Sequence, residues 1–220
     1  MIISRTPYRV SFFGGGTDYP EWFESNGGAV VASAINKYAY IICQRTPRFV
    51  DYRYRISYRN TEIVSNIDEI QHPAVREAIR LLGIPYGIEL NHHGDLLARS
   101  GVGSSSAFAV GLLNVLHHLG ARRMSPAGLA REAIELEHDI LHETVGCQDQ
   151  FTCALGGLNY LEFGPQRSVS VRPITPGPEV LDEIDERMVI VYSGEQRISS
   201  VVAEPLIGNV KSQEKLFNAT

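Results

Sequence analysis

The stretch GVGSSSA, at residues 101–107, places two glycines and three serines directly before an apolar, helix-forming run. Glycine lets backbone N–H groups approach a ligand closely, and a helix N-terminus presents unpaired amides with a partial positive charge. Together these features make an anion site. Serine hydroxyls at the junction can add hydrogen bonds or bind a magnesium ion. The stretch therefore predicts a phosphate-binding loop, although a flexible surface loop before a core helix has a similar composition.

Two other phosphate-binding loops do not fit this stretch. A Walker loop requires lysine after its last glycine, where this chain has Ser104. A dinucleotide-binding fingerprint requires a third glycine where this chain has Ser106. The run after the serines is apolar nearly all round, which predicts a buried helix that holds the loop still. The predicted phosphate contacts come from six consecutive residues: Gly101, Val102, Gly103, Ser104, Ser105 and Ser106.

A second chemical signal is a carboxylate on the apolar face of the helix predicted over 125–143. At about 100° per residue, the leucines, isoleucines and alanines of this run form adjacent stripes, and Glu137 falls between them. A lone carboxylate on a core face is costly unless it is paired, hydrogen-bonded or bound to a metal. An ion pair with Arg9 or another cation and a metal site are both open interpretations.

Two further acidic residues, Asp18 and Asp149, are candidate functional groups because of the segments in which they lie. A strand predicted over 2–13 presents Arg9 and ends at a triple glycine, after which Asp18 precedes a short predicted helix. Asp149 stands between two glutamines before another short helix. Either carboxylate can serve as a helix cap. A role in binding or catalysis is the alternative for both.

In their order along the chain, these segments resemble the motifs of the GHMP kinases, a superfamily of galacto-, homoserine, mevalonate and phosphomevalonate kinases. GVGSSSA resembles the second family motif, and RTPYRVSFFGGGTDYP, residues 5–20, resembles the first. GCQDQ, residues 146–150, is similar to the segment that carries the catalytic aspartate. The form Gly-Gly-Gly-Thr-Asp resembles D-glycero-D-manno-heptose 7-phosphate kinases and the related fucokinases more than galactokinases.

The resemblance implies ATP-dependent phosphorylation of a sugar phosphate, at the anomeric hydroxyl of D-glycero-D-manno-heptose 7-phosphate. Asp149 would accept or orient the hydroxyl proton, and Arg9 would keep Asp149 ionised and stabilise charge in the transition state. The loop would hold the ATP phosphates, while Ser105 and Glu137 would hold Mg²⁺. A kinase for unphosphorylated fucose or galactose and a non-catalytic sugar- or nucleotide-binding module are the alternatives. The implied substrate contacts are Gly16, Thr17, Asp18 and Arg197.

The expected fold class is α+β. The resemblance implies a two-layer GHMP-kinase N-terminal domain with a ribosomal-protein-like βαβ layer over 1–178. It also implies the truncated start of a ferredoxin-like α+β C-terminal domain over 179–220, because the third family motif is missing from the chain. Locally, the apolar runs 29–35 and 38–44 predict a β-hairpin, and 188–192 predicts a strand.

Composition narrows the partners and the compartment. The net charge of −5 argues against a nucleic-acid partner. Three cysteines, an odd number without zinc-site spacing, predict reduced thiols in a cytoplasmic protein. The N-terminus lacks the features of a signal peptide, and no apolar run is long enough to span a membrane. We therefore expect small-molecule partners, ATP and a sugar, with a homodimer as an additional prediction.

Overall fold

One long, bent strand organises the molecule. The computed structural model describes residues 1–98, 100–192 and 194. Strand β2 (Gly28–Arg45) pairs along one edge with β1 (Ile2–Phe13). Its opposite edge pairs first with β6 (Leu158–Gly164) and then with β5 (Ile88–Gly94), so its two halves lie beside different strands.

The predicted hairpin over 29–35 and 38–44 is therefore wrong. Asn36 and Lys37, which lie between the two runs, are exposed within a continuous strand. β1 follows the bend of β2 through register shifts, one of them between Pro7 and Arg9. Both apolar runs are instead buried by separate neighbours, a pairing that no local feature of the sequence dictates.

Among the described residues, the sheet has seven strands in the order β4–β3–β5–β2–β6–β7, with β1 joined to β2. The β3–β5 pair is parallel, and the other described pairs are antiparallel. The remaining strands are β3 (Tyr54–Ser57), β4 (Thr61–Val64) and β7 (Ser168–Pro173).

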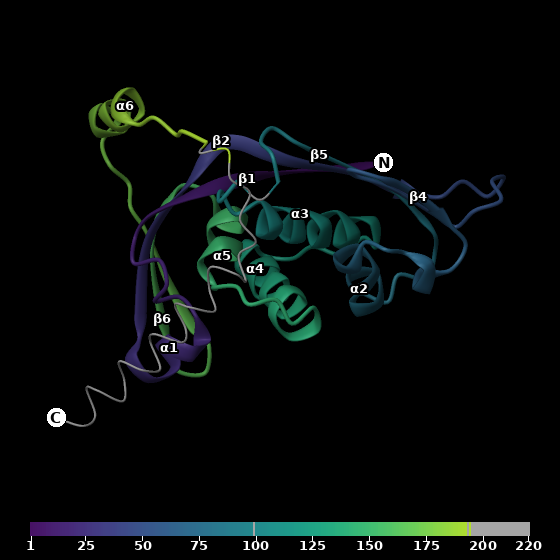
Figure 1. Ribbon diagram of the computed structural model, residues 1–220, viewed down its shortest axis with the longest axis horizontal. Coiled ribbons are helices and arrows are strands. Elements are labelled where there is room, and N and C mark those ends of the chain that lie inside the picture. The colour runs from purple at the N-terminus through teal and green to yellow at the C-terminus, as the bar shows by residue number, and fades with distance from the viewer. Residues whose placement is uncertain (99, 193, 195–220) are drawn as a thin grey trace.

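Four helices, α2 to α5, lie together beneath the sheet, and α6 stands apart beyond the bend of β2 (Figure 1). This arrangement is a mixed α/β fold with one helical layer, in agreement with the predicted α+β class. No helix in the described part of the chain has both the length and the apolar character that a membrane span requires. The helices are α1 (Pro20–Asn26), η1 (Ile67–Glu69), α2 (Pro73–Leu81), α3 (Ser104–Leu119), α4 (Pro126–Ile134), η2 (Glu135–Ile140), α5 (Gln148–Leu155) and α6 (Pro178–Arg187).

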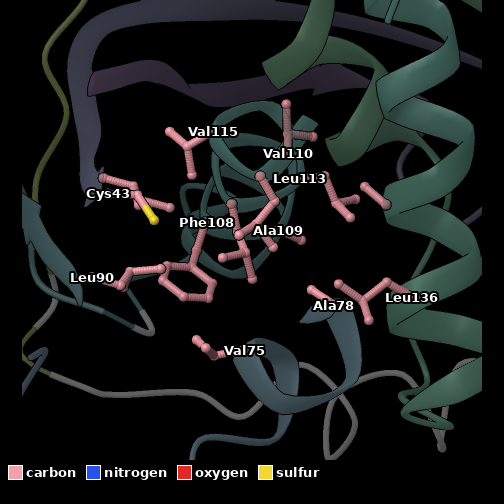
Figure 2. Packing of buried hydrophobic residues seen from close by; sticks show 14 of the residues in the cluster. Cys43, Val75, Ala78, Leu90, Phe108, Ala109, Val110, Leu113, Val115 and Leu136 are labelled. Carbon is pink, nitrogen blue, oxygen red and sulfur yellow. The ribbon is translucent and has the colours of Figure 1, made fainter. Parts of the chain in front are cut away.

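Helix α3 is the centre of the core, as its all-round apolar sequence predicts. It packs on β1 and β2 and also contacts α2, α4 and α5. Figure 2 shows Phe108 of α3 directed towards Leu90 and Val75. Leu113 lies closer to Leu136 than Phe108 does. Each such side chain that leaves water stabilises the fold by about 1.5–3 kcal/mol. The helix that begins at the glycine–serine loop is therefore held firmly in place.

Three local predictions need correction. The helix over 125–143 is not uniform, because α4 passes into the π-helical turn η2, a feature that often marks functional sites. Residues 188–192 form no strand and are largely exposed. The residue that caps α1 is Tyr19 rather than Asp18, whose side chain is turned inward.

Candidate functional site

Arg9 and Asp149 form a bidentate ion pair between β1 and the first turn of α5. Nε of Arg9 donates to Oδ1 of Asp149 at 2.5 Å, and Nη2 donates to Oδ2 at 2.6 Å. The remaining guanidinium nitrogen, Nη1, donates to the Gly101 carbonyl at 2.7 Å. The two side chains are 15% and 21% exposed, so the pair is sheltered but accessible. Arg9 thus connects the glycine–serine loop with the carboxylate of Asp149.

The environment of Arg9 keeps it charged. Burial alone would lower the pKa of the guanidinium, but the charge and hydrogen bonds of Asp149 raise that pKa overall. A bidentate arginine–carboxylate pair also fixes the plane of both groups. The carboxylate of Asp149 is therefore held in one orientation beside the loop.

The loop passes directly against this pair. Gly103 has φ 71° and is the N-cap residue of α3, which begins at the predicted junction. A Cβ atom at Gly103 would lie 2.9 Å from Cγ of Arg9 and 3.3 Å from Oδ2 of Asp149. The backbone N–H of Arg9 donates to the Val102 carbonyl at 3.0 Å. Only glycine suits both this positive φ and this close approach.

Glu137 lies at the other side of the α3 N-terminus and is 1% exposed. Its Oε1 accepts a hydrogen bond from Ser105 Oγ at 2.6 Å. Its Oε2 accepts one from Ser106 Oγ at 2.9 Å and one from Gln150 Nε2 at 2.7 Å. Within the described residues no cationic side chain pairs with Glu137, and Arg9 is engaged by Asp149 instead. The predicted proximity of Ser105 and Glu137 is thus observed, whereas the ion-pair interpretation is not.

The chemistry of this cluster fits a hard divalent cation. Burial raises the pKa of Glu137 to about 7, even though the three hydrogen bonds lower it. The carboxylate and hydroxyl oxygens of Glu137 and Ser105 are ligands of the kind that Mg²⁺ prefers. Ser105 is exposed, so its end of the cluster is open to a ligand. A bound cation would compensate the buried negative charge.

Asp18 is completely buried, at 0% exposure, and its carboxylate bonds to backbone amides. Oδ1 accepts from the N–H of Gly16 and Oδ2 from that of Gln148, both at 3.1 Å. Burial and the charge of Asp149 raise the pKa of Asp18. A Cβ atom at Gly146 would lie 1.9 Å from Oδ2, so the backbone closes tightly around this carboxylate. Asp18 therefore fastens the glycine turn to the segment that precedes Asp149.

The other predicted substrate contacts are distributed differently. Thr17 Oγ1 donates to the carbonyls of Gly14 and Ala29, at 2.8 and 3.1 Å, and so stabilises the glycine turn. Arg197 lies outside the described residues. Whether Gly16, Thr17 and Asp18 contact a substrate stays a prediction.

A cleft of about 500 Å³ opens beside the ion pair. Among the described arginines, Arg9 is the one that lines it; Arg5 stacks on Tyr38 and Arg53 donates to the Pro85 carbonyl. Two glutamines that flank Asp149 were missed as functional candidates, although the motif GCQDQ displays them. The cleft is lined by Arg9, Val10, Ser11, Phe12, Phe13, Gly14, Gly15, Ser100, Gly101, Val102, Gln148 and Ile190.

Residues 70–157, which include the loop, Glu137 and Asp149, match the family model described as GHMP kinases N terminal domain. This segment of the chain is therefore similar to the GHMP kinase N-terminal domain. It is 24% identical to the D-glycero-alpha-D-manno-heptose 7-phosphate kinase of Campylobacter jejuni subsp. jejuni serotype O:2, over 98% of this chain and 66% of the relative.

Several solved structures have a fold similar to that of this chain. A D-glycero-D-manno-heptose 1-phosphate kinase from Bacteroides thetaiotaomicron is 25% identical with a TM-score of 0.76, over 84% of this chain and 63% of that chain. A putative sugar kinase from Campylobacter jejuni is 23% identical with a TM-score of 0.71, over 99% of this chain and 72% of that chain. The chain therefore spans roughly two thirds of the length of these relatives.

Proposed function

We propose that this GHMP kinase domain serves an ATP-dependent kinase that phosphorylates a hydroxyl group of a sugar phosphate. The observation that carries the proposal is the contact between the Arg9–Asp149 pair and Gly103 of the glycine–serine loop. A loop that binds phosphates and a carboxylate that can accept a proton lie side by side there. Phosphoryl transfer depends mainly on such positioning and on electrostatic stabilisation.

In the proposed mechanism Asp149 accepts or orients the proton of the attacking hydroxyl. Arg9 holds both oxygens of Asp149 and supplies positive charge where negative charge develops on the transferred group. The backbone amides and hydroxyls from Gly101 to Ser106, at the α3 N-terminus, hold the nucleotide phosphates. The buried packing of α3 keeps this anion site in place during the reaction.

Ser105 and Glu137 are the residues proposed to hold Mg²⁺. The ion supplies charge neutralisation for the nucleotide phosphates when it is bound. Ser106 and Gln150 contribute indirectly, since both donate to Oε2 of Glu137 and so fix its other oxygen towards Ser105. Because Ser106 and Gln150 occupy Oε2, we expect the ion to bind at Oε1, next to the exposed Ser105.

The specific substrate proposed is D-glycero-D-manno-heptose 7-phosphate, phosphorylated at its anomeric hydroxyl to the 1,7-bisphosphate. Two of the similar proteins, both heptose phosphate kinases, support this choice. Unphosphorylated fucose or galactose is the second candidate, because no described arginine other than Arg9 lines the cleft to bind a substrate phosphate. Substrate contacts by Asp18 and Arg197, a start of the second domain at 179, a homodimer and a cytoplasmic location belong to the same proposal.

A substrate panel tests the proposal. The full chain is incubated with MgATP and either heptose 7-phosphate, mannose 6-phosphate, fucose or galactose, and the product is identified by ³¹P NMR. Phosphorylation of the heptose phosphate at its anomeric position is the expected result. Preferential turnover of fucose or galactose would show that the substrate is a free sugar rather than the heptose phosphate. Binding of MgATP without turnover of any sugar would favour the non-catalytic module.

A further inference from the structure

Gln148 places a buried amide in the wall of the cleft, one residue before Asp149. It is 8% exposed, and its side chain belongs to the cleft lining. Its backbone is held firmly, because its N–H donates to Oδ2 of Asp18 at 3.1 Å and its carbonyl accepts from Thr152 Oγ1 at 2.8 Å. The amide is therefore attached to a rigid part of the site.

The side-chain oxygen of Gln148 is not satisfied by the described protein around it. This atom, Oε1, is buried without a hydrogen-bond partner among the residues that the structure describes. Leaving a buried polar atom unpaired costs about 1–3 kcal/mol, and Asp149 beside it uses both oxygens in its ion pair. A terminal rotation can exchange the two ends of the amide, so either end can face the cleft.

The glycine turn leaves space for a ligand at this amide. A Cβ atom at Gly15 would lie 3.7 Å from Nε2 of Gln148 and 3.6 Å from Oγ of Ser11. Both polar side chains and Gly15 line the same cleft. A hydroxyl group is both donor and acceptor, as a primary amide also is, so the two are complementary.

We propose that Gln148 is a specificity-determining residue that hydrogen-bonds a hydroxyl of the sugar neighbouring the one presented to Asp149. This inference rests on the proposed sugar-kinase function and goes beyond it by naming the side chain that reads the polyol. A site that pairs a buried polar group with a substrate hydroxyl discriminates strongly against the analogue that lacks this hydroxyl. Ser11, whose Oγ lies near the same point beside Gly15, is positioned to share the contact.

The test uses Gln148→Met in the full chain, which preserves length but removes the amide. With heptose 7-phosphate as the probe, kcat/KM for the sugar should fall about tenfold or more, while KM for ATP changes less than twofold. Single-deoxy derivatives of the probe identify the hydroxyl that is read. The derivative lacking it should be a poor substrate for the wild-type chain and should lose nothing further in Gln148→Met.

Gly15→Ala provides a matched steric variant. Gly15 does not have a positive φ, and the added methyl would meet its nearest neighbours at ordinary contact distances, so folding should be preserved. The methyl covers the approach to the amide and should weaken use of the sugar without affecting use of ATP. Gly14→Ala is unsuitable as a control, because its Cβ would lie 1.8 Å from the Ala29 carbonyl oxygen.

The outcomes separate this inference from the proposed function. If Gln148→Met lowers kcat/KM equally for the probe and for every deoxy derivative, Gln148 merely positions Asp149 and the inference is wrong. If the wild-type chain turns over no sugar, calorimetric binding of heptose 7-phosphate replaces kinetics. Weaker binding by Gln148→Met then supports the inference alone, and equal binding, or none by either chain, overturns it.

Discussion

Two carboxylates flank the glycine–serine loop, and their surroundings differ sharply. Asp149 is 21% exposed and is held at 2.5 and 2.6 Å by a guanidinium. Glu137 is 1% exposed and is held only by neutral donors, which leave its charge uncompensated and its pKa at about 7. The first carboxylate has its counterion within the fold. The second has no counterion among the described residues, which is the physical reason to propose Glu137, together with Ser105, as the metal-binding residue.

The largest expected effect follows the loss of the paired carboxylate. Asp149→Asn keeps the shape of the side chain but cannot accept a proton, so turnover should fall about 10²–10⁴-fold. Binding of MgATP, measured by calorimetry, should be unchanged because the loop amides remain. Turnover at the wild-type level in the substituted full chain would remove Asp149 from the proton-transfer role.

Arg9→Lys tests the geometry of the same pair while preserving its charge. Lysine lacks the planar fork that contacts both oxygens of Asp149 and also the Gly101 carbonyl. A small displacement of Asp149 should lower kcat roughly tenfold to a hundredfold. Steady-state kinetics measure this change, and a full rescue by lysine would show that charge without the fork is sufficient.

Glu137→Gln tests the unpaired carboxylate through pH. The folded-state pKa of about 7 exceeds the usual unfolded value of roughly 4.3, so the folded chain binds more protons between these values. Without Mg²⁺, stability should therefore decrease as pH rises through this window, by roughly 4 kcal/mol in total. Urea unfolding at several pH values in EDTA measures the slope.

The Gln variant should lose this part of the slope, while Asp18 and Glu143, whose pKa values are also raised, retain theirs. Added Mg²⁺ should stabilise the wild-type chain at pH 8 and leave the Gln variant unaffected. An identical pH slope in both chains would contradict a raised pKa at Glu137.

The smallest effects come from the two serines that donate to Glu137. Ser105 is exposed and Ser106 is 3% exposed. Ser105→Ala should weaken Mg²⁺ binding severalfold with little change in stability, whereas Ser106→Ala should destabilise the fold by about 1 kcal/mol. Calorimetry with Mg²⁺ and urea unfolding separate the two. Equal changes in both variants would contradict the proposal that Ser105 binds the metal while Ser106 only stabilises Glu137.

Local patterns predicted the features that depend on neighbouring residues. The start of α3 at Ser104 follows from a glycine with positive φ before a run of helix formers. The burial of Glu137 follows from helical periodicity, which remains informative despite the π-helical turn. The strand β1, which presents Arg9 shortly before a glycine turn, was likewise readable from alternation.

Tertiary structure decided the features that depend on distant partners. β2 is one strand because β5 and β6 cover its two halves, and the local sequence describes neither neighbour. Aspartate commonly caps helices, yet the backbone amides of Gly16 and Gln148 hold the Asp18 carboxylate in the protein interior. The candidacy of Gln148 depends on the fold alone, which places its buried, unpaired side-chain oxygen in a residue of the cleft wall.

The sequence by itself determined the chemical groups, their order along the chain and the helix that anchors the loop, because side-chain chemistry and helical periodicity are local properties. The fold decided which groups meet. Arg9 and Asp149 are 140 residues apart and Ser105 and Glu137 are 32 apart, so only the packing of β1, α3, η2 and α5 brings them within hydrogen-bond distance. The fold also pairs Asp149 with a cation and leaves Glu137 buried among neutral donors. That difference arises from the environment of each carboxylate rather than from its residue type.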